Sequence, residues 1–90
     1  MKILVVCGHS FIVEMNAQES LRQLNAPSDI EVEHSDIMTA SPEMADLFIC
    51  GRDLAENAER LGDVLVLDNI LDKAELQQKL AEKLQQLNMI

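Results

Sequence analysis

The sequence predicts an α/β protein built on an open four-stranded parallel sheet with helices on both faces. Two observations lead to this class. Short apolar segments alternate with segments of helical spacing, and residues 3–7 and 47–50 are apolar at every position. Strands that are apolar throughout are typical of parallel sheets, which are covered on both faces. We expect the strand order 2-1-3-4, because it places these two strands at the centre.

The first half of the chain predicts a strand, a helix and a second strand. After the strand at 3–7, Ser10 is a good N-cap, and apolar residues recur at helical spacing as far as Leu24. Residues 25–28, Asn-Ala-Pro-Ser, end this helix. Residues 30–34 alternate between apolar and polar side chains, as expected of an edge strand with one solvent-facing side.

The second half predicts a strand, a short helix, a strand and a longer helix, after a turn of helix around Glu43. The strand at 47–50 is followed by a capping-box pattern, Asp53 with Glu56, and Gly62 suits the end of the short helix. Residues 64–67 form the last strand. The final helix begins with a second capping box, Asp72 with Glu75, and has apolar residues at 76, 80, 81, 84 and 87.

The composition fits one domain, residues 1–90, with a Rossmann-like architecture. The chain is 48% hydrophobic but only 2% aromatic, so its core is aliphatic. A net charge of −9 argues against nucleic-acid binding, because phosphates would repel the protein. Two cysteines and the lack of a signal-like start indicate the cytoplasm. The apolar run at 3–7 is too short to insert into a membrane.

Nucleophilic and titratable side chains gather at the carboxyl ends of the predicted strands. Cys7, His34 and Cys50 end the first three strands, and His9 and Arg52 lie in the adjoining loops. Ligands of open parallel sheets bind at this edge, near the point where the strand order reverses. We expect the sulfurs of Cys7 and Cys50 to lie within several Å, close enough to cross-link on oxidation. Arg52 is interpreted either as a phosphate contact or as part of a surface ion pair.

Cys7 is the candidate nucleophile. The run Cys7-Gly8-His9-Ser10 joins a buried strand to a helix, so the thiol faces the free N–H groups and the positive end of the helix dipole. These groups stabilise a thiolate and bind phosphate. The alternative is that Cys7 is a small buried residue ending a strand. Cys50 is interpreted as a packing residue and His34 as a solvated side chain.

Several runs of the sequence resemble enzyme IIB of the bacterial sugar phosphotransferase system. The resemblance is to the ascorbate and galactitol type, and its most specific part is the strand-Cys-Gly motif, Lys-Ile-Leu-Val-Val-Cys-Gly at residues 2–8. It covers essentially the whole chain and continues through residues 10–16, 32–36, 45–47, 52–55 and 67–72.

This resemblance implies a phosphoryl carrier without a cofactor or metal. Members of the family take a phosphoryl group from a phosphohistidine of a IIA partner onto the Cys after the first strand. They pass it to a sugar that is held by the membrane component IIC and reached only through it. Carried over, Cys7 is the phosphorylated nucleophile, and the phosphate is surrounded by Gly8, His9, Ser10 and Phe11. The protein would be cytoplasmic and peripheral to the membrane through IIC.

The loop after Cys7 departs from the family pattern Cys-Gly-x-Gly-x-Gly-Ser-Ser. About four residues are missing, including glycines that let the backbone approach a phosphate. Either the sequence omits residues that the natural chain contains, or the loop is truly shortened. A truly shortened loop favours a binding module without chemistry.

A redox protein is a further alternative. Cys7-Gly8-His9-Ser10 has the Cys-x-x-Ser form of a monothiol glutaredoxin site. That fold needs a C-terminal antiparallel hairpin, however, and the single strand at 64–67 does not predict one. A zinc site made of the two cysteines and two histidines lacks the usual ligand spacing.

Overall fold

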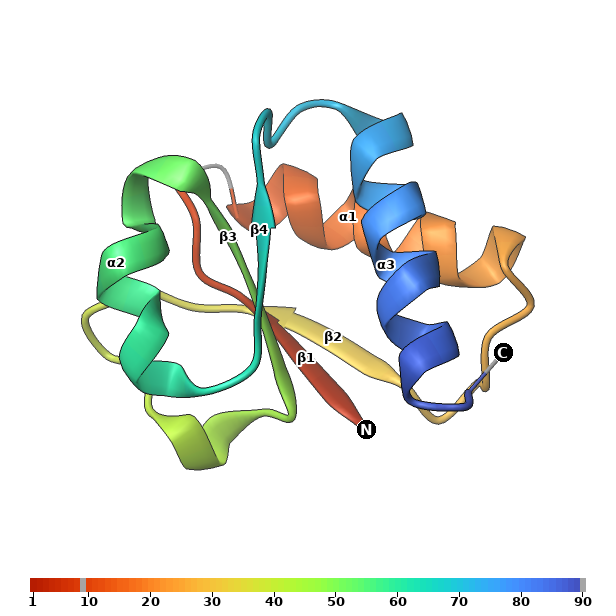
Figure 1. The fold of residues 1–90 in the computed structure, drawn as a ribbon, viewed down its shortest axis with the longest axis horizontal. Helices are drawn as coiled ribbons and strands as arrows, with labels where there is room; N and C mark the ends of the chain where they lie inside the picture. The colour runs from red at the N-terminus through yellow and green to blue at the C-terminus, as the bar shows by residue number, and fades with distance from the viewer. Residues whose placement is uncertain (9, 90) are drawn as a thin grey trace.

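A computed structural model of the chain describes residues 1–8 and 10–89. Its four strands form one parallel sheet in the order β2-β1-β3-β4, so the predicted fold class and strand order are confirmed (Figure 1). The central strands are entirely or almost entirely buried, as their continuous apolar sequences predicted. The strands are β1 (Lys2–Val5), β2 (Glu31–His34), β3 (Leu47–Gly51) and β4 (Val64–Leu67).

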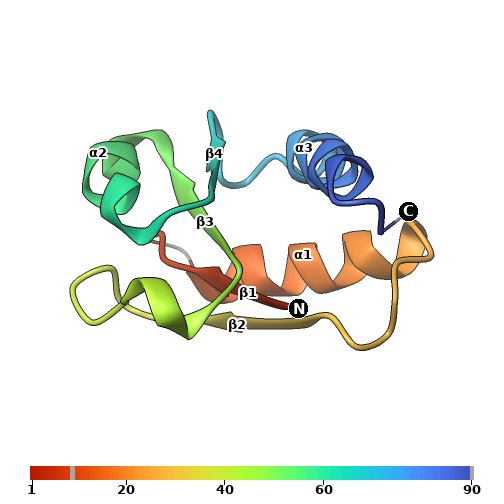
Figure 2. The same ribbon diagram turned by 60° about the horizontal axis from the view of Figure 1, so that its bottom comes forward.

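Helices cover both faces of this sheet (Figure 2). Helices α1 (Ser10–Gln23) and α3 (Lys73–Gln86) pack side by side on one face, and the short helix α2 (Ala55–Ala58) lies on the other. Helix α3 buries Leu76, Leu80 and Leu84, which the four-residue spacing places on one side of the helix. Each such leucine contributes about 1.5–3 kcal/mol relative to an exposed one.

The helix predicted after β3 is less regular than the sequence indicated. The chain forms a 3-10 turn, then α2, then another 3-10 turn that ends at Gly62. The predicted capping box is wrong, because Asp53 lies inside the first 3-10 turn and no side chain caps either element. Gly62 is confirmed as the end of this segment, and its φ of 112° favours a residue without Cβ. The turn predicted around Glu43 is a 3-10 turn, Pro42–Met44.

Strand register assigns side chains to two separate cores. Val5 is paired with Ile49, and the next N–H, that of Val6, donates to the Ile49 carbonyl at 2.8 Å. Cys50 is therefore level with Val6, and both pack in the core under α2. Cys7 belongs to the core under α1 and α3. The two cysteines lie at the same edge of the sheet, but neither is the last residue of its strand, since Cys7 lies two residues beyond β1 and Cys50 one residue before the end of β3. Their side chains lie on opposite faces, so the expected cross-link is not favoured.

Candidate functional site

Cys7 lies at the carboxyl edge of the sheet, two residues after β1 and three residues before α1. Its side chain is 7% exposed and packs in the core under α1. The hydrogen bond from Val6 to β3 holds the backbone just before it. Gly8, the next residue, is exposed, and a Cβ added there would meet nothing within 4 Å. The thiol is thus buried against the sheet, and the loop residue next to it is exposed.

The first turn of α1 begins three residues after Cys7 and carries no acidic residue. The first backbone N–H groups of a helix have no acceptor within the helix, and they lie at the positive end of its dipole. Of the residues predicted to surround a phosphate, Gly8 lies in the loop, Ser10 begins the helix and Phe11 lies in its first turn. His9 lies outside the described residues.

Cys50 does not share the properties of a nucleophile. Its side chain is fully buried, and burial raises its pKa to about 11, with further contributions from negative charge at Cys7 and Asp53. A thiol with this pKa is protonated at neutral pH and reacts slowly, because the thiolate is the nucleophile. The interpretation of Cys50 as a packing residue agrees with this environment.

Arg52 forms a surface ion pair, the second of its two predicted interpretations. Its Nη2 lies 3.2 Å from Oδ1 of Asp68, and both side chains are largely exposed. The pair borders a shallow groove of about 510 Å³ at the ends of β3 and β4. Arg52 therefore already has a carboxylate partner on the side of the rim formed by β3 and β4.

His34 is exposed, as the sequence indicated, with 46% of its side chain accessible, and it also contacts two residues of α1. Its Nδ1 lies 3.1 Å from Oε2 of Glu14, and its ring meets the Phe11 ring edge-on, with centroids 6.2 Å apart. Both partners come from the N-terminal part of α1. Sequence reasoning missed Glu14, although its three-residue spacing from Phe11 places the two side chains on the same side of the helix.

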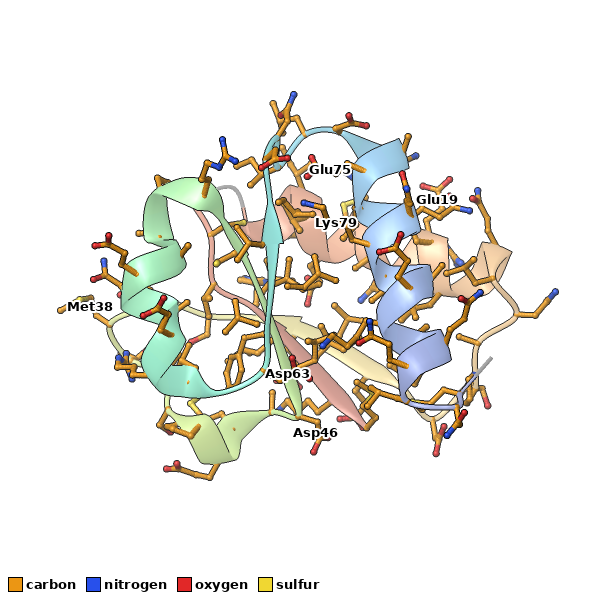
Figure 3. The ribbon with its side chains drawn as sticks, in the orientation of Figure 1. Glu19, Met38, Asp46, Asp63, Glu75 and Lys79 are labelled. Atoms are coloured by element: carbon orange, nitrogen blue, oxygen red, sulfur yellow. The ribbon has the colours of Figure 1, made fainter. Side chains whose placement is uncertain are left out.

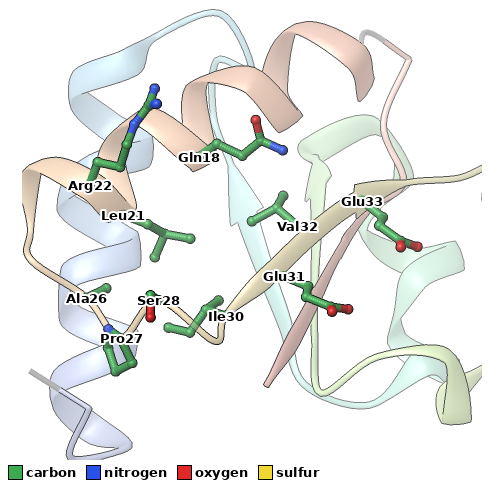
Figure 4. Close-up of a pocket in the computed structure, with 10 residues that line it drawn as sticks. All are labelled: Gln18, Leu21, Arg22, Ala26, Pro27, Ser28, Ile30, Glu31, Val32 and Glu33. Atoms are coloured by element: carbon green, nitrogen blue, oxygen red, sulfur yellow. The ribbon is translucent and has the colours of Figure 1, made fainter.

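A groove of about 620 Å³ lies away from Cys7, between the C-terminal part of α1 and the edge strand β2 (Figure 4). Its walls include Leu21 and Arg22 of the helix and Glu31 to Glu33 of the strand. Among residues 1–8 and 10–89, no group of three or more His, Cys, Asp or Glu side chains could hold a metal ion. In the same residues, no helix is both long enough and apolar enough to cross a bilayer.

The fold and site define a class: a small parallel α/β domain with a buried thiol between a central strand and a helix N-terminus. Residues 2–82 match the model of the lactose/cellobiose-specific IIB subunit family of the phosphotransferase system (PTS), so the chain belongs to this family. It is a PTS IIB phosphotransferase component with the phosphoryl-carrier domain of that family.

A solved structure supports the same fold. The lactose-specific IIB component domain from Streptococcus pneumoniae is 19% identical in sequence and superposes with a TM-score of 0.53. The alignment covers 98% of this chain and 94% of that chain. No curated protein sequence matches the chain.

These comparisons confirm the resemblance to enzyme IIB at the level of the family. The ascorbate and galactitol type remains a prediction. The redox alternative lacks its fold, because every strand pair in the described residues is parallel and no antiparallel hairpin follows β3.

Proposed function

We propose that this protein accepts a phosphoryl group from a phosphohistidine of a IIA protein onto Cys7 and passes it to a sugar bound by a membrane IIC component. The observation that carries this proposal is the position of Cys7, at the end of a central strand and three residues before the 14-residue helix α1. Membership of the IIB family supports the reaction class. The IIC partner would keep the protein at the cytoplasmic side of the membrane.

The first transfer exchanges a P–N bond for a P–S bond. The Cys7 thiolate attacks phosphorus, the bond to the donor imidazole breaks, and the released imidazole nitrogen keeps the electron pair and takes up a proton. The N–H groups of the first turn of α1 stabilise the phosphoryl oxygens. In the second transfer a sugar hydroxyl attacks phosphorus and gives up its proton to solvent, the P–S bond breaks, and sulfur keeps the electron pair, so the thiolate is restored.

The exposed face of α1 beside Cys7 supplies a docking surface for both partners. Phe11, Ile12 and Met15 are large apolar side chains that are 62%, 45% and 53% exposed. The chain has a net charge of −9, and phosphorylation adds about −1.5 to −2, so we expect apolar and basic surfaces on IIA and IIC. We further propose a sugar of the ascorbate or galactitol type, because residues 2–8 and 10–16 resemble the enzyme IIB proteins of that type.

A binding module without chemistry is the second candidate, and the short loop is the observation that favours it. Because α1 begins at Ser10, the loop offers fewer backbone N–H groups than the family pattern. The same experiment separates the two candidates, since only a carrier is phosphorylated on Cys7.

The test is phosphoryl transfer from a phosphorylated IIA protein to the purified chain, followed by intact mass. We expect Cys7→Ser to lower phosphorylation at least about 100-fold, because a hydroxyl is a far weaker nucleophile than a thiolate at neutral pH. Cys50→Ser is the matched control and should keep most of the activity. Thermal melts check that both variants are folded.

Undiminished labelling of a folded Cys7→Ser protein would refute the mechanism. Labelling lost only in Cys50→Ser would move the nucleophile to β3. A wild-type chain that takes no phosphoryl group from the donor would support the binding module.

A further inference from the structure

Glu14 and His34 form a carboxylate–imidazole pair beside the first turn of α1. Oε2 of Glu14 lies 3.1 Å from Nδ1 of His34, and the planes of the Phe11 and His34 rings meet at 88°. A carboxylate accepts hydrogen bonds, so the ring meets Glu14 with Nδ1–H as the donor. Contacts with one part of α1 therefore fix both the place and the tautomer of this ring.

This pair lies on the same face of the sheet as Cys7. His34 is the register partner of Val5, and register partners of neighbouring strands project to the same face. Val5 and Cys7 both pack in the core under α1. Cys7 lies two residues beyond Val5, where β1 ends. Strand spacings continued past that end would put the Cα atoms of His34 and Cys7 about 8 Å apart.

Three other charged groups near this pair have partners of their own, whereas Asp53, at the carboxyl end of β3, adds negative charge beside Cys50. On the opposite face of the sheet, Glu33 binds Lys2 at 2.9 Å. Asp36 accepts a backbone N–H in the turn after β2. Arg52 is paired with Asp68 at the ends of β3 and β4. Among the described residues, the Glu14–His34 pair is thus the charged pair that joins β2 to the first turns of α1.

We propose that His34 is a positioning residue for the phosphoryl group on Cys7, and that it acts by cancelling the charge of Glu14 when it is protonated. This inference rests on the proposed function. With a neutral ring the pair keeps one negative charge and repels a phosphoryl group of about −1.5 to −2. With an imidazolium the pair is neutral and the repulsion is removed.

The coupling must work in both directions. If protonation of His34 favours a negative group on Cys7, a negative group on Cys7 favours protonation of His34 to the same extent. The charge of the imidazolium matters more in this protein because the short loop offers fewer N–H donors to the phosphoryl group than the family pattern does.

A pair of alkylating agents isolates this effect. Iodoacetate and iodoacetamide give Cys7 adducts of nearly the same shape that differ by one negative charge. Cys50 is fully buried with a pKa of about 11, so one adduct per chain is expected and is checked by mass. The readout is the NMR titration of the His34 ring proton, assigned in a His9→Gln background.

We expect the titration midpoint of His34 to be about 0.5 pH unit higher in the carboxymethyl protein than in the carbamidomethyl protein. This value corresponds to unit charges roughly 9 Å apart at an effective dielectric constant of about 55, between that of a protein surface and that of water. The difference should shrink in high salt. Cys7→Asp and Cys7→Asn provide a second matched pair that needs no alkylation.

A second readout is phosphorylation of the variants His34→Gln and Glu14→Gln/His34→Gln. At about pH 5.5, where an ordinary imidazole is mostly protonated, the single variant should lower the phosphorylated fraction about threefold. The double variant should restore it, because the uncompensated carboxylate is gone. A purely structural role predicts that the double variant is no better than the single one.

The inference would be overturned if the His34 titration midpoints differed by less than about 0.1 pH unit in both matched pairs. It would also be overturned if the double variant were phosphorylated no better than His34→Gln. The titration uses no donor protein. A failure there leaves Cys7 as the proposed phosphoryl acceptor, whereas a failure of the Cys7→Ser test removes the proposed function itself.

Discussion

Replacing Glu75 with Gln tests the most highly connected carboxylate of the structure. Glu75 lies in the first turn of α3, next to Lys79 (Figure 3). Its two oxygens accept the backbone N–H groups of Asp68 and Asn69 at 2.6 and 2.9 Å. Lys79 binds the same carboxylate at 2.8 Å. Gln has one oxygen, so one of these N–H groups loses its acceptor.

The size of the effect follows from the ionisation of this group. The Lys79 ammonium, together with the two N–H groups, lowers the pKa of Glu75 from 4.5 to about 2. At face value this shift corresponds to about 3 kcal/mol of folding free energy. The carboxylate lies close to solvent, which screens the interaction, so we expect about 1–2 kcal/mol at neutral pH.

The direction of the pKa shift determines how the stabilisation by Glu75 depends on pH. The pKa of Glu75 is lower in the folded state, so its stabilisation is present above pH 4.5 and is lost as the pH falls towards 2. Urea unfolding of the wild type and Glu75→Gln should therefore differ by about 1–2 kcal/mol at pH 7, or about 5–10 °C in Tm. The difference in unfolding free energy between the two proteins should decrease steadily between pH 5 and pH 2.

The matched control is Glu82→Gln on the exposed side of the same helix, which should change stability by less than about 0.5 kcal/mol. Equal stability of Glu75→Gln and the wild type at pH 7 would refute the reasoning. A gap that stays constant down to pH 2 would show that it does not come from ionisation.

Two further predictions concern the rim of the sheet. A Cβ at Gly51 would lie 2.8 Å from Oδ1 of Asp53 and 2.9 Å from Cγ2 of Ile70, so Gly51→Ala should cost about 1–3 kcal/mol in thermal melts. Gly8→Ala meets open space and should change stability by less than about 0.5 kcal/mol; similar melts of the two variants would contradict this. Phosphoryl transfer from the donor should slow with added salt, and Phe11→Ser should lower kcat/KM about tenfold. Leu87→Ser, at the far end of α3, is the control, and transfer that ignores ionic strength would exclude charge steering.

The sequence by itself determined the sheet and the candidate nucleophile. Residues 3–7 and 47–50 are apolar at every position, which is typical of a strand covered on both faces, and this pattern predicted their central place. The sequence also predicted α3, because leucines spaced four residues apart lie on one side of a helix and are buried together there. Cys7 stood out because it ends such a strand just before a helix.

Which side chains of different elements lie close together could be seen only in the tertiary structure. A register in which Cys50 is level with Val6 puts the two thiols on opposite faces, and sequence patterns do not specify register to one residue. The capping-box pattern at Asp72 was correct for its own side chain, which accepts the Glu75 N–H. The Glu75 carboxylate does not complete this capping box; it accepts the N–H groups of Asp68 and Asn69, the two residues after β4.

The same reason explains why Glu14 was missed. Its partner His34 is 20 residues away in sequence, and the two meet only because β2 lies beside β1 and under the start of α1. Periodicity reports which side of an element is buried, since that depends on neighbours in the chain. The partner of an exposed charge depends on how separate elements are placed in space, and this placement was decided by the packing of the two cores.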